Sequence, residues 1–192
     1  MNVGIIVEGP DDHAVYKVLL KRINPAIQRV YPHECGGRHK LKNKFVPLLK
    51  VFEGNPAAYR LSKVIVIRDS DCQDPRPLEE EMRRTLDASG LQTSFEVAFH
   101  ATKCKLESWL LADLDAISAV SASRGGSRVS ETFDADLETM READVVYRRV
   151  VRTAGLQDTS AVMGKIAEAA SLERISERCP RFRDFRKKAE TR

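Results

Sequence analysis

The chain has 192 residues, a net charge of +4, 42% hydrophobic residues and 31% charged residues. This balance is ordinary for a folded domain and excludes a globally disordered chain. No apolar run approaches the ~20 residues that cross a bilayer, and the opening MNVGIIVEGPDD lacks the basic region of a secretory signal. We therefore expect a cytoplasmic protein with no membrane partner.

The cysteines are scattered along the chain and form no CxxC pair. They are Cys35, Cys72, Cys104 and Cys179. This spacing argues against a zinc site and against a disulfide framework, so reduced thiols are the expectation.

Hydrophobic periodicity predicts strands that alternate with helices through about residue 113. The expected strands are residues 2–9, 26–32, 62–71 and 93–101, and the expected helices are 11–23, 44–54, 78–89 and 105–120. A Gly-rich basic loop, CGGRHKLKN, precedes the helix at 44–54, in which Pro47 fits only near the first turn. Helical stretches dominate the last third of the chain.

This alternation predicts an α/β fold with a mostly parallel sheet and helices on both faces. We expect residues 1–113 to form this α/β core and residues 114–192 to form a mainly helical extension packed on it. Ligands of such sheets bind beyond the carboxyl ends of the strands. Glu8 follows the first predicted strand, and Asp69 and Asp71 end the third. All three acids are therefore expected at one rim of the sheet.

The stretch VIVIRDSD places Asp69 and Asp71 two residues apart, a spacing that points strand side chains to the same side. Carboxylates gathered in one place raise one another's pKa unless a cation neutralises them. Mg²⁺, or Mn²⁺ in its place, takes such oxygen ligands and works with substrate phosphates. A DxD alone is a weak signal, because a strand-end Asp often caps the next helix. Its combination with Glu8 is much more specific.

The motifs IIVEGPDD and VIVIRDSD together resemble the TOPRIM domain, the metal-binding module of topoisomerases, DnaG-type primases and OLD nucleases. The resemblance implies that Glu8, Asp69 and Asp71 hold a metal ion, and its OLD-like form implies a further role for Asp12. The glycines of ECGGRHK also recur in the OLD-like branch. In the later part of the chain, ESWLLAD and CPRFRDF look like small, stand-alone TOPRIM-like bacterial proteins.

Further candidates lie after the fourth predicted strand and in the Gly-rich loop. Glu107 either completes a second metal position or is a first-turn acid of its own helix. Lys103 or Lys105 could stabilise charge on a phosphorane-like transition state, and Lys40 could hold a phosphate. An ordinary surface lysine is the alternative for each. Asp113 is expected to end its helix or to cap the next one.

Two basic clusters could hold a nucleic-acid backbone without reading its sequence. One is GGRHKLKNK, and the other is the terminal segment from Arg178 to Arg192. A solvated surface is the alternative for both. The chain lacks the GxxxxGK[ST] loop of an ATPase. Because OLD nucleases usually carry a fused ATPase, the resemblance implies a separately encoded ATPase as a partner.

Three functions are compatible with these features. The first is a Mg²⁺- or Mn²⁺-dependent nuclease of a defence or repair system, acting on DNA or RNA. In it Glu8, Asp69 and Asp71 hold metal, while Asp12 and Glu107 assist. The second is a non-catalytic TOPRIM-like regulatory or nucleic-acid-binding subunit. The third is a haloacid-dehalogenase-type phosphatase, which also uses a strand-end DxD. The Thr that such enzymes carry two residues after the second Asp is here a glutamine.

Overall fold

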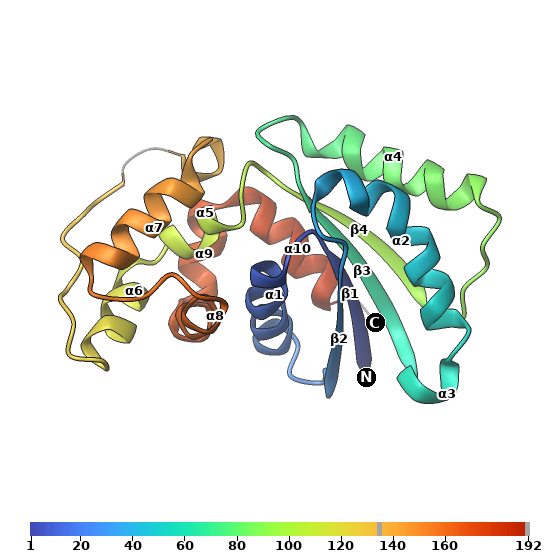
Figure 1. Cartoon of the computed structure of the whole chain (residues 1–192), viewed down its shortest axis with the longest axis horizontal. Helices are drawn as coiled ribbons and strands as arrows, with labels where there is room; N and C mark the ends of the chain where they lie inside the picture. Colours follow the sequence, from blue (N-terminus) through green and yellow to red (C-terminus); the bar gives the residue numbers. More distant parts are fainter. Residues whose placement is uncertain (134–135, 191–192) are drawn as a thin grey trace.

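The computed structural model describes residues 1–133 and 136–190, and it confirms the α/β class. All the strands are parallel and form one sheet in the order β2-β1-β3-β4 (Figure 1). They are β1 (Asn2–Val7), β2 (Arg29–Glu34), β3 (Leu61–Asp69) and β4 (Glu96–Thr102). The second strand begins later than predicted because residues 25 and 26 form a turn.

Helices cover both faces of the sheet, with α1 and α10 on one side and α2 and α4 on the other (Figure 1). The predicted helical C-terminal extension is present as α6 to α10. None of the helices formed by the described residues combines the length and apolar character of a membrane span. The helices are α1 (Pro10–Ile23), α2 (Arg38–Glu53), α3 (Pro56–Tyr59), α4 (Pro75–Ala88), α5 (Glu107–Leu111), α6 (Leu114–Ala122), the 3-10 helix η1 (Leu137–Thr139), α7 (Ala143–Thr153), α8 (Ser160–Ala169), α9 (Leu172–Arg178) and α10 (Pro180–Glu190).

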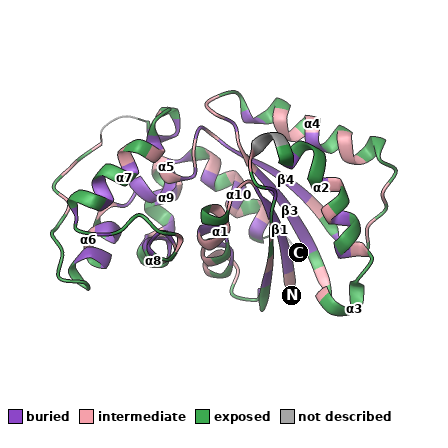
Figure 2. Ribbon diagram, in the orientation of Figure 1, coloured by how far each residue is buried: buried purple, intermediate pink, exposed green. Residues whose placement is uncertain are grey.

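Successive side chains of the central strands enter two different hydrophobic cores, because strand side chains alternate between faces. Ile5 and Ile65 pack with α1 and the C-terminal helices, whereas Ile6 and Val66 pack with α2 and α4. Burial therefore runs almost without interruption along β1 and β3 (Figure 2). This is typical of a parallel sheet covered on both faces.

The Gly-rich basic segment was expected as a loop, but most of it is helix. α2 begins at Arg38, so Lys40 lies on the helix and Pro47 lies in its interior rather than in its first turn. An interior proline costs a helix about 3 kcal/mol. Burial of the side chains of Phe45, Leu49 and Phe52 stabilises the fold by about 1.5–3 kcal/mol each, so packing outweighs that cost.

The helix expected at 105–120 is two helices, α5 and α6, which are separated at Asp113. Asp113 occupies the N-cap position of α6, yet its carboxylate caps no amide of that helix. Instead it accepts hydrogen bonds from the backbone N–H of Ser171 at 2.8 Å and from Arg174 at 2.8 Å. The break therefore lets Asp113 bind the start of α9. This contact joins segments that are distant in sequence, so local periodicity does not reveal it.

The expectation that all cysteines are reduced is wrong for one pair. A disulfide joins Cys72, in the turn after β3, to Cys104, in the turn after β4. Cys35 and Cys179 are free and buried. β3 and β4 are neighbours in the sheet, and this adjacency brings together two cysteines that are far apart in sequence.

Candidate active site at the carboxyl ends of the strands

Glu8 directly follows β1 and points toward the end of the neighbouring strand β3. Its Oε1 accepts a hydrogen bond of 3.3 Å from the backbone N–H of Asp69. The main chain of Glu8 is fixed from the other side, because the N–H groups of Gly36 and Gly37 donate to its carbonyl at 3.0 and 2.8 Å. Both glycines have positive φ, at 76° and 114°, a conformation that favours glycine. The glycines on which the TOPRIM resemblance partly rests thus fix the backbone of Glu8.

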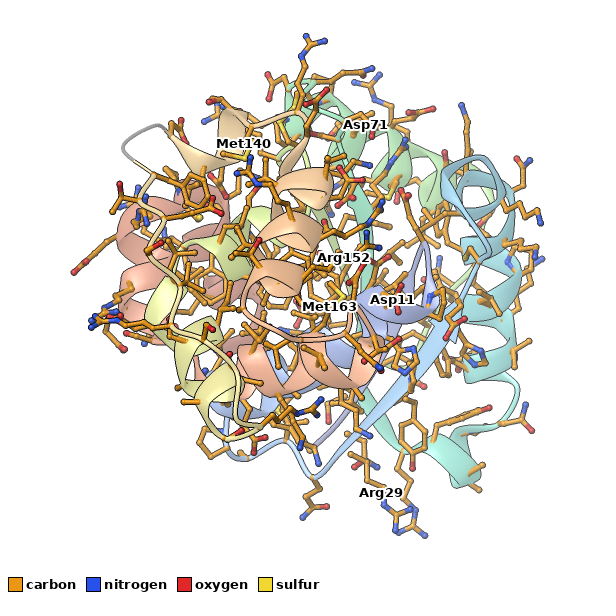
Figure 3. The ribbon with its side chains drawn as sticks, turned by 60° about the vertical axis from the view of Figure 1, so that its left-hand side comes forward. Asp11, Arg29, Asp71, Met140, Arg152 and Met163 are labelled. Atoms are coloured by element: carbon orange, nitrogen blue, oxygen red, sulfur yellow. A yellow bond between two sulfur atoms is a disulfide. The ribbon has the colours of Figure 1, made fainter. Side chains whose placement is uncertain are left out.

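Asp69 and Asp71 come together, but not by the strand alternation on which the prediction relied. β3 ends at Asp69, and Asp71 sits beyond it with φ of 48°, in the left-handed region (Figure 3). A single ammonium links the two acids, since Nζ of Lys105 lies 3.9 Å from Oδ2 of Asp69 and 3.2 Å from Oδ1 of Asp71. Between them Ser70 is buried, and its Oγ accepts from the N–H of Cys104 at 3.2 Å.

Asp12 and Glu107 flank these acids from α1 and α5. Oδ2 of Asp12 accepts from the N–H of Gly9 at 2.9 Å, so Asp12 also caps the start of α1. Burial, reinforced by the nearby carboxylate of Glu8, raises the pKa of Asp12 to about 6. Burial, reinforced by the carboxylates of Asp12 and Asp144, raises the pKa of Glu107 to about 7. Both acids therefore exchange protons near neutral pH.

The same electrostatics act on the central pair. Burial raises the pKa of Asp69 well above its ordinary value, and the charges of Asp12, Glu107 and Glu8 raise it further. Burial, with the Asp71 charge, also raises the pKa of Glu8. The acids therefore lie close enough to act on one another. Together we call them the carboxylate rim: Glu8, Asp12, Asp69, Asp71 and Glu107.

The carboxylate rim fits a hard divalent cation by the chemistry of its donors. Carboxylate oxygens are the ligands that Mg²⁺ and Mn²⁺ prefer, and burial together with the neighbouring carboxylates raises the pKa values of Glu8 and Asp69. The ammonium of Lys105 already compensates part of the negative charge of Asp69 and Asp71. Within residues 1–133 and 136–190, no three His, Cys, Asp or Glu side chains are already grouped as a ligand cluster.

The predicted phosphate-binding lysines differ in their surroundings. Lys105 is in the rim, where burial opposes its charge but Asp69 and Asp71 raise its pKa. Lys103 lines a pocket of about 500 Å³ that Cys72 also lines and that includes no rim acid. Lys40 is exposed on the first turns of α2.

Much of the terminal basic segment supports the fold instead of presenting a free cationic surface. Arg178 donates to the carbonyls of Ala112 and Phe133. Arg181 and Lys188 both pair with Glu79 on α4. Arg192, the last residue of the predicted cluster, lies outside the described residues.

Two residues near the rim were not singled out from the sequence, and both come from α7. Asp144 raises the pKa values of Glu107 and Lys105 through its charge. Tyr147 is buried, and its hydroxyl has no hydrogen-bond partner among the described residues. No local pattern marks either residue, because helix α7 is distant in sequence from the strand ends and packs against α5 at the site.

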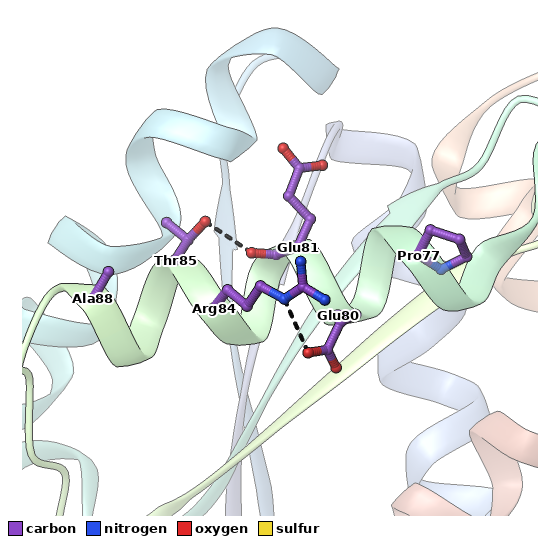
Figure 4. Close-up of a pocket in the computed structure, with 6 residues that line it drawn as sticks. All are labelled: Pro77, Glu80, Glu81, Arg84, Thr85 and Ala88. Carbon is purple, nitrogen blue, oxygen red and sulfur yellow. Dashed lines mark hydrogen bonds and ion pairs between the residues drawn. The ribbon is translucent and has the colours of Figure 1, made fainter.

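A further pocket, of about 440 Å³, lies along the exposed side of α4 (Figure 4). All the residues lining it come from this one helix, including Glu80 and Arg84, which pair with each other at 3.1 Å. It contains no member of the carboxylate rim. We regard it as a hollow between surface side chains and not as the reaction site.

Comparison with protein families gives one match, to the family described as "Domain of unknown function (DUF4276)", over residues 7–190. The match covers the strand ends with their acids and the C-terminal helices alike. No curated protein and no solved structure matches the chain. The chemistry of the site therefore has to be argued from its own residues.

Proposed function

The chain belongs to the DUF4276 family, whose description assigns no activity, and from the site itself we propose that it is a divalent-metal-dependent nuclease acting on DNA or RNA. The observation that carries this proposal is the meeting of acids from separate segments at one rim, where Glu8 contacts the backbone of Asp69 and Lys105 bridges Asp69 and Asp71. Such a rim suits metal-assisted hydrolysis, in which carboxylates hold a cation and the cation stabilises the negative charge of the scissile phosphate.

Four of the five rim acids, together with Lys105, have roles that their surroundings support. Glu8, Asp69 and Asp71 would hold the cation, which when bound supplies Lewis-acid activation of water and of the scissile phosphate. Lys105 would release its carboxylates and compensate charge on a phosphate oxygen. Glu107, with a pKa of about 7, can take a proton from water at neutral pH.

A further feature supports the proposal. The order of the motifs, with Glu8 after β1 and the DxD at the end of β3, is that of the TOPRIM domains which the sequence resembles. The same resemblance implies a separately encoded ATPase as a partner.

The proposal is tested by cleavage assays with the full chain on plasmid DNA, single-stranded DNA and RNA, each with Mg²⁺, with Mn²⁺ and with a chelator. We expect metal-dependent cleavage of at least one substrate. The double substitution Asp69→Asn with Asp71→Asn should reduce it more than the ~10–100-fold that loss of an outer-shell partner costs. Asp87→Asn, an exposed acid on α4, is the matched control and should cleave normally.

A second candidate function is a non-catalytic regulatory or nucleic-acid-binding subunit. One observation favours it, namely that Lys105 already compensates the charges of Asp69 and Asp71 without a metal. Calorimetric titration with Mn²⁺ separates the two functions. Nucleic-acid binding without any Mn²⁺ binding or cleavage would support the subunit and count against the nuclease.

A further inference from the structure

We propose that the Cys72–Cys104 disulfide is a reversible redox site which holds Asp71 and Lys105 in place, and that a low-molecular-weight thiol opens it from the pocket beside Cys72. This inference goes beyond the proposed function and does not rest on it. It concerns the order of two turns, which can be measured whether or not the protein cleaves nucleic acid.

The disulfide joins the two turns that carry the rim's ion pair. Cys72 directly follows Asp71, and Cys104 directly precedes Lys105. Across the link, Nζ of Lys105 lies 3.2 Å from Oδ1 of Asp71. The covalent bond and the ion pair thus connect consecutive residues of the same two turns, so release of the bond acts directly on the pair.

The backbone on both sides of the link lies in a conformation that non-glycine residues seldom adopt. φ is 48° at Asp71, 66° at Cys72 and 56° at Cys104. Individually weaker contacts also connect the two turns, among them the N–H of Cys104 donating to Oγ of Ser70 at 3.2 Å, the N–H of Ser70 donating to the carbonyl of Thr102 at 2.8 Å, and the ion pair itself. We expect these residues to leave the left-handed region once the covalent constraint is gone.

A small thiol can reach one end of the bond. Cys104 is fully buried, but Cys72 is partly exposed and lines the pocket of about 500 Å³ that also contains Lys103 and Arg76. This volume lies within the range of small-molecule pockets. The free cysteines Cys35 and Cys179 are buried, which sets them apart from Cys72. Thiol–disulfide exchange should therefore begin with attack on Sγ of Cys72.

The exchange balances with two equivalents of thiol. The thiolate of the first attacks Sγ of Cys72 and forms a mixed disulfide, and the displaced Cys104 thiolate takes up a proton. A second thiolate attacks the sulfur of the bound small molecule. The products are a free disulfide of the small thiol and a second protein thiol at Cys72, so two electrons pass from the small thiols to the protein.

The test uses the full chain equilibrated with mixtures of reduced and oxidised glutathione, trapped with an alkylating reagent and mapped by peptide mass. We expect Cys72 and Cys104 to become alkylated together in the folded protein, while Cys35 and Cys179 react only after denaturation. Hydrogen exchange should speed up about tenfold on reduction at residues 70–73 and 103–106 and stay constant in β1.

The double variant Cys72→Ala with Cys104→Ala should show fast hydrogen exchange in both turns in every glutathione mixture. Cys179→Ala, which removes a buried free thiol, should keep the wild-type transition. If glutathione opens no bond in the folded protein, or if reduction leaves exchange in both turns unchanged, the proposal is wrong. Mn²⁺ titration of both redox forms is a separate arm, in which absence of binding in either form counts against the nuclease alone.

Discussion

At the scale of single residues, the carboxylate rim makes the protein's stability depend on pH in an uncommon direction. Glu107 has a pKa of about 7 in the folded state against an ordinary value of 4.5. Because the folded state holds this proton more tightly than the unfolded state, the free energy of unfolding falls as pH rises from about 4.5 to 7. Asp12 acts in the same direction up to a pKa of about 6.

Glu107→Gln should therefore stabilise the metal-free protein at pH 8 by about 1–3 kcal/mol, since the buried group no longer has to ionise. At pH 4.5 the variant and the wild type should unfold almost equally, because the wild-type carboxyl is protonated there. Urea titrations in chelator at both pH values provide the measurement. A variant that is less stable than the wild type at pH 8 would contradict the assignment.

Lys105 and Lys103 form a matched pair for testing the ion bridge. Lys105→Ala leaves Asp69 and Asp71 without their shared ammonium, so we expect a loss of about 1 kcal/mol at pH 8 without metal. Lys103→Ala, two residues away, should change stability less. Thermal unfolding with and without Mn²⁺ checks this, and the deficit of Lys105→Ala should shrink if the cation replaces the ammonium. Equal losses in the two variants would show that the bridge contributes no stability.

At the scale of elements, a single carboxylate from α4 connects the β4 strand to two cations of α10. Oε1 of Glu79 accepts from the N–H of Ala101 at 2.9 Å and from Lys188 at 2.9 Å, and it also pairs with Arg181. Glu79→Ala leaves two partly buried cations and one strand amide without this partner. We expect it to cost about 2–4 kcal/mol of unfolding free energy in denaturant titrations.

Glu80→Ala is the control for that substitution. Glu80 is the next residue on the same helix, it is half exposed, and it pairs with Arg84 one helical turn away. Such pairs contribute less than about 0.5 kcal/mol. If the two substitutions proved equally mild, Glu79 would not be the link between α4, β4 and α10 that its contacts indicate.

The elements also show where sequence reasoning is reliable. The strands were found because fully buried parallel strands read as continuous apolar runs, as in VIVI of β3. Asp113 was expected to end its helix or to cap the next one, and it lies at the N-cap position of α6. The interior position of Pro47 in α2 and the partners of the Asp113 carboxylate were not predicted. Both follow from contacts with distant segments, namely the packing of Phe45 and Leu49 in one case and the hydrogen bonds to Ser171 and Arg174 in the other. Local periodicity carries no record of such contacts.

At the scale of the whole molecule, the C-terminal helix α10 packs into the same hydrophobic core as β1 and α1. The ring of Phe185 lies 5.4 Å from Tyr16 of α1 and 5.4 Å from Trp109 of α5, centroid to centroid. All three side chains are buried. The C-terminal helix is therefore as much a part of the α/β core as the helices next to the strands in sequence.

Phe185→Ala should consequently destabilise the whole chain by about 3–5 kcal/mol, the usual cost of removing a fully buried aromatic ring. Arg183→Ala on the exposed side of α10 is the comparison, expected within about 0.5 kcal/mol of the wild type. Unfolding monitored separately by Trp109 fluorescence and by far-ultraviolet circular dichroism should give coincident transitions. If the Phe185→Ala protein lost the Trp109 signal first, the helical part would be unfolding on its own.

The candidate site was predictable as far as topology alone decides it. β1 and β3 are adjacent, so acids placed after each of them, Glu8 and Asp69, necessarily meet. The position of Asp71 could not be derived in this way, because it depends on a left-handed turn beyond the strand. The choice of Lys105 over Lys103 and the pairing of Cys72 with Cys104 depend on how two turns approach each other in space.

The side chains gathered around Ala101 also limit how the protein can associate with others. Arg181 donates to the carbonyl of Ala101 and Lys188 to that of Phe99, while Glu79 accepts from the amide of Ala101. An incoming peptide would need these outward groups of β4 to lengthen the sheet. Because charged side chains already occupy them, this border is closed to strand exchange between copies and to amyloid-like stacking. The helices that complete the fold thereby also block the β4 edge of the sheet.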